Sequence, residues 1–120
     1  NEDIRGDGVD DYRRGRHEEA MQDALKAFES TLKTICDLRK WKYQPDKDTA
    51  KALCKAVIDN GLLAPYMSTV LDGLPIIRNK YAGHGTGSTP RAVPAYLASY
   101  ALHLAASNIV MLVEAHRAKK

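Results

Sequence analysis

The stretch from Pro94 to Val113 carries no charged side chain over 20 residues. A helix of this length is nominally long enough to span a membrane. The stretch also contains two serines, a histidine and an asparagine, and its many alanines are only weakly apolar. These features favour a helix buried against several neighbours over a membrane span. We therefore expect a long central helix from Pro94 to about Ala118, in a protein that does not cross a membrane.

Small side chains on this helix predict the close approach of another helix. They are Ala98, Ala101, Ala105 and Ala106. The neighbouring helix is either the long helix predicted near the amino terminus or the same helix of a second subunit.

A second long helix is predicted from Arg16 to Lys40. Apolar side chains recur along it at helical spacing, which predicts one buried stripe. They are Met21, Leu25, Phe28, Leu32, Ile35 and Cys36. Glu18 and Glu19 would lie in its first turn and Arg39 in its last, as the helix macrodipole favours. Residues 1–15 are interpreted as the remnant of a preceding helix or linker that ends at Gly15.

Shorter helices are predicted between the two long ones. Asp48 can cap a helix over Thr49–Asp59, and Gly61 can stop it. Pro65 is suited to open a third helix, and Pro75 to mark a restart. No pair of strands is recognisable. The predicted fold is an all-α bundle of four to five helices over residues 16–118, with the long first and last helices packed antiparallel.

Two cysteines, Cys36 and Cys54, are the only ones in the chain. Both lie in helical apolar patterns and are expected to be buried thiols. No cysteine or histidine follows them at ligand spacing, so no metal site is predicted. Free thiols fit a reducing cytoplasm, although one disulfide is compatible with the sequence.

Charge is distributed unevenly along the chain. Residues 1–60 hold 12 Lys/Arg and 13 Asp/Glu, whereas residues 61–120 hold 6 and 2. No acidic residue lies between Gly73 and Val113, but Arg78, Lys80 and Arg91 do. A polar stretch with cations and no acids favours an anionic partner such as phosphate.

The segment from Ile76 to Gly85 gathers the side chains best suited to chemistry. Arg78 and Asn79 present hydrogen-bond donors, and His84 lies between two glycines. Arginine binds phosphate bidentately, and histidine exchanges a proton near neutral pH. Glycines let backbone N–H groups approach an anion closely. These parts suit phosphodiester cleavage. Taken alone, an arginine and a histidine six positions apart are more often a helix cap and a surface residue.

Three blocks of sequence, in order, resemble the C-terminal domain of abortive-infection (Abi) proteins, a member of the HEPN superfamily. The blocks are 27–36, 78–80 with 83–85, and 96–98 with 100–106. The resemblance covers residues 12–114 and includes the Arg–His motif of HEPN domains.

The resemblance implies a homodimer in which the motifs of two subunits form one cleft. It also implies a metal-independent ribonuclease without cofactors, used as a toxin against phage-infected cells. Arg78 would polarise the scissile phosphate of RNA, His84 would transfer the proton, and Asn79 would orient one of them. The 2′-hydroxyl would attack the adjacent phosphate. An antitoxin or an amino-terminal domain of the parent protein are further expected partners.

Five more residues are candidates for substrate contact: Lys80, Gly83, Gly85, Glu29 and Lys33. Lys80 is either a phosphate ligand or a surface residue. Glu29 and Lys33 lie one turn apart and form either a solvated ion pair or part of the cleft. Because some HEPN domains bind without cleaving, a non-catalytic interaction or nucleotide-sensing module is the alternative function.

The remaining aromatic and histidine side chains are given structural roles. His103 is expected to be buried and hydrogen-bonded, and His116 to lie on the surface. Tyr81, Trp41 and Tyr43 are expected to cover the edge of the core, with base stacking as the alternative for Tyr81.

Overall fold

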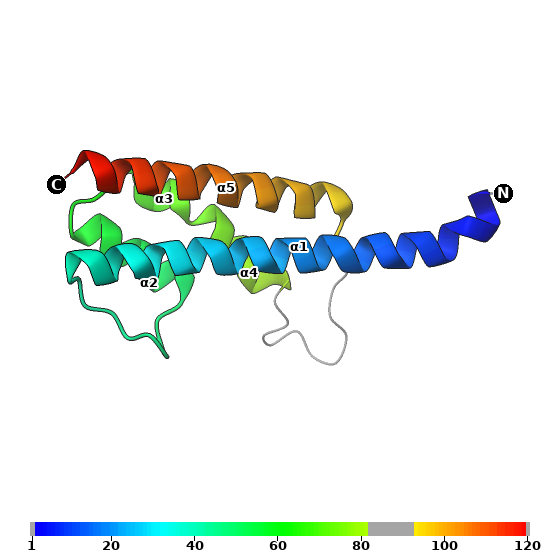
Figure 1. The fold of residues 1–120 in the computed structure, drawn as a ribbon, viewed down its shortest axis with the longest axis horizontal. Helices are drawn as coiled ribbons and strands as arrows, with labels where there is room; N and C mark the ends of the chain where they lie inside the picture. Colours follow the sequence, from blue (N-terminus) through cyan, green and yellow to red (C-terminus); the bar gives the residue numbers. More distant parts are fainter. Residues whose placement is uncertain (1, 82–92, 120) are drawn as a thin grey trace.

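The computed structural model describes residues 2–81 and 93–119 of the chain. Five helices follow one another within these ranges, which contain no strand. The two long helices lie side by side, and three short helices pack against them (Figure 1). The predicted all-helical class and the packing of the first helix on the last are confirmed.

The first helix, α1, spans Glu2–Arg39 and buries the predicted apolar stripe. Each of the six side chains in that stripe is at most 5% exposed. The helix ends where Lys40 adopts a left-handed conformation with φ 60°. The N–H of Trp41 donates to the Cys36 carbonyl at 2.8 Å, and that of Lys40 to the Asp37 carbonyl at 3.2 Å. This pair of bonds is a Schellman motif, which satisfies carbonyls at the end of the helix.

The predicted break at Gly15 is wrong, because α1 continues through this residue without interruption. A glycine in a helix interior costs only about 1 kcal/mol relative to alanine, which the adjoining turns tolerate. Glu18 and Glu19 consequently lie in the middle of the helix and not in its first turn. The assignment of residues 1–15 to a separate preceding segment stays a prediction.

The second helix, α2, spans Ala50–Asp59, close to its predicted range. Its cap is Thr49, whose Oγ1 accepts a hydrogen bond from the N–H of Ala52 at 3.4 Å. The prediction that Asp48 is the cap is therefore wrong by one residue. The Asp48 carboxylate instead accepts from the N–H of Gln44 at 2.8 Å, which closes the loop before the helix.

Gly61 ends α2 as predicted, with φ +81°. The N–H of Leu62 donates to the Val57 carbonyl at 2.9 Å, which forms a second Schellman motif. A single turn after Pro65 leads into α3, Met67–Leu71. The fourth helix, α4, spans Gly73–Tyr81. Pro75 lies in its first turn, where a missing N–H costs no intrahelical bond.

The last helix, α5, spans Ala95–Ala118 and runs parallel to α1, as the colours of Figure 1 show. At its start, the N–H of Val93 donates to Glu18 Oε1 at 3.3 Å. Near its end, His116 Nδ1 accepts from Arg39 Nε at 2.8 Å. The predicted antiparallel packing is therefore wrong. The short helices α2 to α4 carry the chain back along α1, so α5 starts near the middle of α1 and repeats its direction.

Three of the four alanines singled out on α5 are buried: Ala98, Ala101 and Ala105 are at most 2% exposed. They belong to the same core cluster as the stripe of α1, so the first long helix is the neighbour they admit. Ala106 is exposed. By length and composition alone α5 could cross a membrane, and 28% of its most apolar window is buried in the fold.

The carboxyl ends of α1 and α5 are joined by Arg39. Its guanidinium donates to His116 Nδ1, to the His116 carbonyl at 2.8 Å, and to the Lys119 carbonyl, and it lies 5.4 Å from the centroid of the Trp41 ring. His116, expected on the surface, is instead half-buried and accepts a hydrogen bond from Arg39. Trp41 and Tyr43 pack against the core edge, as predicted.

Candidate functional site

The last turn of α4 presents the basic part of the predicted motif. Leu74 is fully buried at the start of this helix, and Gly73 lies against the side chain of Leu104 on α5. Ile77 and Tyr81 pack against the core. This burial on one side holds the helix in place. The core role of Tyr81 is thereby confirmed.

Arg78, Asn79 and Lys80 occupy the other side of this turn. The side chain of Arg78 is half-buried, whereas Asn79 and Lys80 are exposed. Two cations at the carboxyl end of a helix complement its macrodipole.

The guanidinium of Arg78 makes no hydrogen bond or ion pair with any residue that the structure describes. A half-buried guanidinium usually engages a carboxylate or a carbonyl, because its five donors are costly to leave unused. Arg39 and Lys33, by contrast, have partners in the fold. As far as the described residues go, the donors of Arg78 therefore remain available to an anion such as phosphate.

The other half of the motif lies outside the described residues. His84, Gly83 and Gly85 belong to the segment 82–92, which joins α4 to α5. The distance between Arg78 and His84, and the predicted roles of the two glycines, stay predictions.

Glu18 holds the chain directly after this segment. Its carboxylate accepts from the N–H of Val93, whose side chain is 3% exposed. The bond lies just before α5, where the macrodipole favours a negative charge. Sequence reasoning assigned Glu18 to a helix start and missed this contact, since only the fold brings residues 18 and 93 together.

Glu29 and Lys33 form an ion pair, with Nζ and Oε1 3.8 Å apart and both side chains partly exposed. Lys33 Nζ also lies 3.5 Å from the Pro45 carbonyl, in the loop that follows α1. In the part of the chain with defined positions, no hydrogen bond or ion pair joins either residue to Arg78. Lys33 thus links the ion pair to the loop after α1. Contact of either residue with substrate stays a prediction.

His103 differs from its expected place, because it is exposed on α5. Its Nδ1 lies 2.7 Å from the Ser99 carbonyl. A carbonyl oxygen only accepts, so Nδ1 donates in this hydrogen bond. The expected hydrogen bond exists, but the expected burial within the chain does not.

Buried thiols are a further titratable feature. Cys36 and Cys54 are free and buried, as predicted. Burial, with a smaller contribution from Asp72, raises the pKa of Cys54 to about 12. Burial also raises the pKa of Cys36, reinforced by Asp37 and Asp48. Neither thiol is therefore an activated nucleophile. No group of three or more His, Cys, Asp or Glu suited to a metal occurs among residues 2–81 and 93–119.

The fold and this turn together define a small helical domain in which the basic end of α4 precedes the long last helix, α5. Comparison with protein families matches residues 7–116 to the HEPN-like domain Abi_C. The chain therefore belongs to the HEPN-like Abi C-terminal domain family, as its resemblance indicated. Neither a curated protein nor a solved structure matched the chain.

Proposed function

We propose that this domain is a metal-independent endoribonuclease that acts as a toxin domain in the cytoplasm of phage-infected cells. Arg78 binds the scissile phosphate, and His84 accepts the proton of the adjacent 2′-hydroxyl. The freed oxygen attacks phosphorus, the bond to the 5′-oxygen breaks, and that oxygen takes a proton from a general acid. The products are a 2′,3′-cyclic phosphate and a free 5′-hydroxyl.

The guanidinium of Arg78, which is half-buried and has no partner among the described residues, carries this proposal. Lys80 adds a second cation two residues further along α4, and no acidic residue occurs between Gly73 and Val113 in the sequence. Such an arrangement favours a polyanion. Asn79 orients the phosphate or the histidine, and Gly83 and Gly85 offer backbone donors. Membership of the HEPN-like family supports the reaction type.

Incubation of the purified chain with total RNA in excess chelator tests the proposal. We expect cleavage by the wild-type protein and 2′,3′-cyclic ends on the products. Arg78→Ala should lose both binding and turnover, because it removes a charge-assisted contact that strengthens in the transition state. Arg117→Ala removes an exposed cation from the last turn of α5 and is the matched control, which should keep full activity.

His84→Ala separates proton transfer from binding. We expect RNA affinity close to wild type and a turnover about 10²–10⁴-fold lower, the usual contribution of general acid–base catalysis. A 2′-methoxy RNA should bind and resist cleavage. Efficient cleavage of that substrate, or full activity of His84→Ala, would refute the mechanism. RNA or nucleotide binding without any cleavage would instead favour the non-catalytic module.

A homodimer with both motifs in one cleft would supply two histidines to one phosphate, one as base and one as acid. Isologous symmetry provides such a pair whenever the motif lies beside a two-fold axis. We retain this arrangement as a prediction of the family resemblance. An antitoxin or an attached amino-terminal domain would then act by covering the cleft.

A further inference from the structure

The carboxyl half of α4 has one exposed side. Ile76, Asn79 and Lys80 are exposed there, whereas the other residues from Leu74 to Tyr81 are buried or half-buried. Asn79 follows Ile76 by three residues and Lys80 follows it by four, so the three side chains are neighbours on the helix surface. We call these three residues the α4 face.

Arg78 lies on a different side of the same helix. Successive residues of an α-helix are about 100° apart, so Arg78 is displaced by about 160° from both Ile76 and Lys80. A helix with its side chains is about 10–12 Å across, and a stacked nucleic-acid strand rises about 3.4 Å per nucleotide. The α4 face is therefore about three nucleotides away from a phosphate bound at Arg78.

The α4 face combines an apolar side chain with a cation. Ile76 is 64% exposed. Lys80 makes no hydrogen bond or ion pair with any of residues 2–81 and 93–119. The nearest acid in the sequence is Asp72, about two helical turns before Lys80. A ligand that covers this face therefore needs an apolar surface beside a negative charge.

A nucleotide has both of these properties. The flat face of a base packs against apolar side chains, and its phosphate attracts a lysine. Four residues of α-helix rise about 6 Å. This spacing places Lys80 within reach of the phosphate of a nucleotide whose base lies on Ile76.

Asn79 flanks Ile76 and adds hydrogen bonds to the edge of the base. Its amide carries donors and an acceptor side by side, and it has no partner within the described ranges. Such an amide pairs bidentately with N6 and N7 of adenine. In an RNA duplex these atoms lie in a groove too deep and narrow for side chains to read. An adenine bound here must therefore be unpaired.

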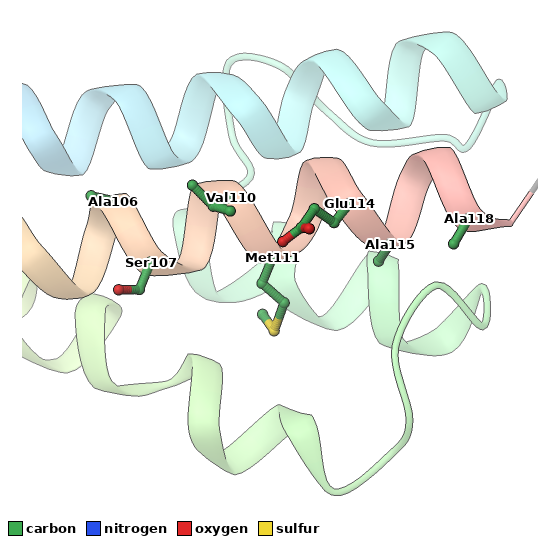
Figure 2. Close-up of a pocket in the computed structure, with 7 residues that line it drawn as sticks. All are labelled: Ala106, Ser107, Val110, Met111, Glu114, Ala115 and Ala118. Carbon is green, nitrogen blue, oxygen red and sulfur yellow. The ribbon is translucent and has the colours of Figure 1, made fainter.

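The open hollow on α5 suits a nucleotide less well. It is lined by residues of this one helix, and the charged side chain among them is the carboxylate of Glu114 (Figure 2). A carboxylate repels phosphate, whereas the ammonium of Lys80 attracts it.

We propose that the α4 face binds an unpaired adenosine of the RNA strand that Arg78 holds. Lys80 binds the phosphate of this nucleotide, Ile76 packs against the face of the base, and Asn79 reads its edge. The inference rests on the proposed ribonuclease function and names its substrate class, which is single-stranded RNA with an adenine about three nucleotides from the cut.

Fluorescence anisotropy with short 2′-methoxy RNA strands measures binding without cleavage. We expect an adenine strand to bind about tenfold more tightly than a uracil or cytosine strand, the selectivity of one bidentate pair. A duplex should bind more weakly than the adenine strand. Lys80→Ala should weaken binding of every strand equally and lower the salt dependence of log Kd by about one unit.

Ile76→Ala tests the apolar contact. It should weaken binding of the adenine strand about fivefold, because it removes apolar area that the base covers. The helix should persist, since alanine is the best helix former. Leu38→Ala is the matched control, because Leu38 is also 64% exposed but lies at the carboxyl end of α1, whereas α4 lies near the middle of α1 (Figure 1).

Asn79→Ala separates base recognition from the orienting role given to Asn79 above. We expect the preference for adenine to disappear in Asn79→Ala and to survive in part in Asn79→Gln, which keeps the amide. Orientation of the phosphate or the histidine alone predicts slower cleavage with an unchanged base preference, and that result would overturn the assignment of Asn79.

The outcomes for the α4 face and for the ribonuclease are distinguishable. Equal binding of single strand and duplex, or equal effects of Ile76→Ala and Leu38→Ala, would overturn the α4 face. RNA cleavage without any base preference would keep the ribonuclease and overturn the α4 face. Adenine-selective binding without cleavage would support the α4 face and refute the ribonuclease.

Discussion

Arg39 provides the clearest test of how α1 and α5 are held in parallel. Its guanidinium donates to the Nδ1 and the carbonyl of His116, both at 2.8 Å, and to the Lys119 carbonyl. The His116 carbonyl is one of the last four of α5, which have no partner within their own helix. Arg39, at the end of α1, therefore caps the carboxyl end of α5, and replacing it with alanine removes this cap.

The expected loss follows from these contacts. Each of the two bonds to His116 contributes about 1 kcal/mol net. The contact with the Trp41 ring adds about 0.5 kcal/mol at a site this exposed. The sum is about 2–3 kcal/mol, with little from the exposed bond to Lys119. At about 4 °C per kcal/mol for a domain of this size, Tm should fall by roughly 10 °C.

Equilibrium unfolding in urea is the assay, with thermal melting followed by circular dichroism as the second measurement. Arg117→Ala, which removes the same charge from an exposed position, should change stability by no more than about 0.5 kcal/mol. Arg39→Lys keeps the charge without the forked donors and should recover less than half of the loss. The reasoning fails if Arg39→Ala and Arg117→Ala are equally stable, or if lysine restores wild-type stability.

Three other predictions concern stability. Lys40→Gly should stabilise the chain by about 1 kcal/mol in urea titration, because glycine adopts the left-handed conformation at φ 60° without strain; an unchanged or lower midpoint would contradict it. As pH rises above 9, Cys54 should lower the stability by up to about 1.4 kcal/mol per pH unit, since it stays neutral in the fold up to about 12 but has an ordinary pKa of 9.0 when unfolded, and Cys36, whose pKa is also raised, adds to this loss. Urea titrations from pH 7 to 10 with reductant measure this, and a flat profile would argue against burial of the thiol. Asn108→Leu should raise Tm, because Asn108 is 5% exposed and its Nδ2 lacks a partner among the described residues; a destabilised variant would indicate that the amide is satisfied.

Most of the helices could be predicted from local patterns. The stripe from Met21 to Cys36 repeats at helical spacing, and all its members are buried. The end of α2 at Gly61 and the start of α5 after Pro94 follow from residues with restricted or special backbone conformations. Local signals failed at two places. Two possible N-cap residues, Asp48 and Thr49, are adjacent, and the helical turns on both sides of Gly15 continue through this glycine.

The candidate site was predictable only as a set of residues. Arg78, Asn79 and Lys80 were identified from their order and from the absence of acids around them, and the fold places all three on one helical turn. Their differences were not predictable. Arg78 is half-buried and has no partner in residues 2–81 and 93–119, whereas Lys33 contacts Glu29 and the loop after α1. Partners that are distant in sequence, such as Glu18 and Val93, leave no local signal.

The sequence by itself determined the all-helical class, the family and the buried face of α1, because hydrophobic periodicity and motif order are local properties of the chain. Only the tertiary structure decided that α1 and α5 run in the same direction and that one face of α5 stays open. Helix direction depends on the path of the connections, and here three short helices return the chain along α1 (Figure 1). The sequence of an uncharged helix does not show whether one side of it or every side is buried, because the tertiary fold determines which other helices pack against it.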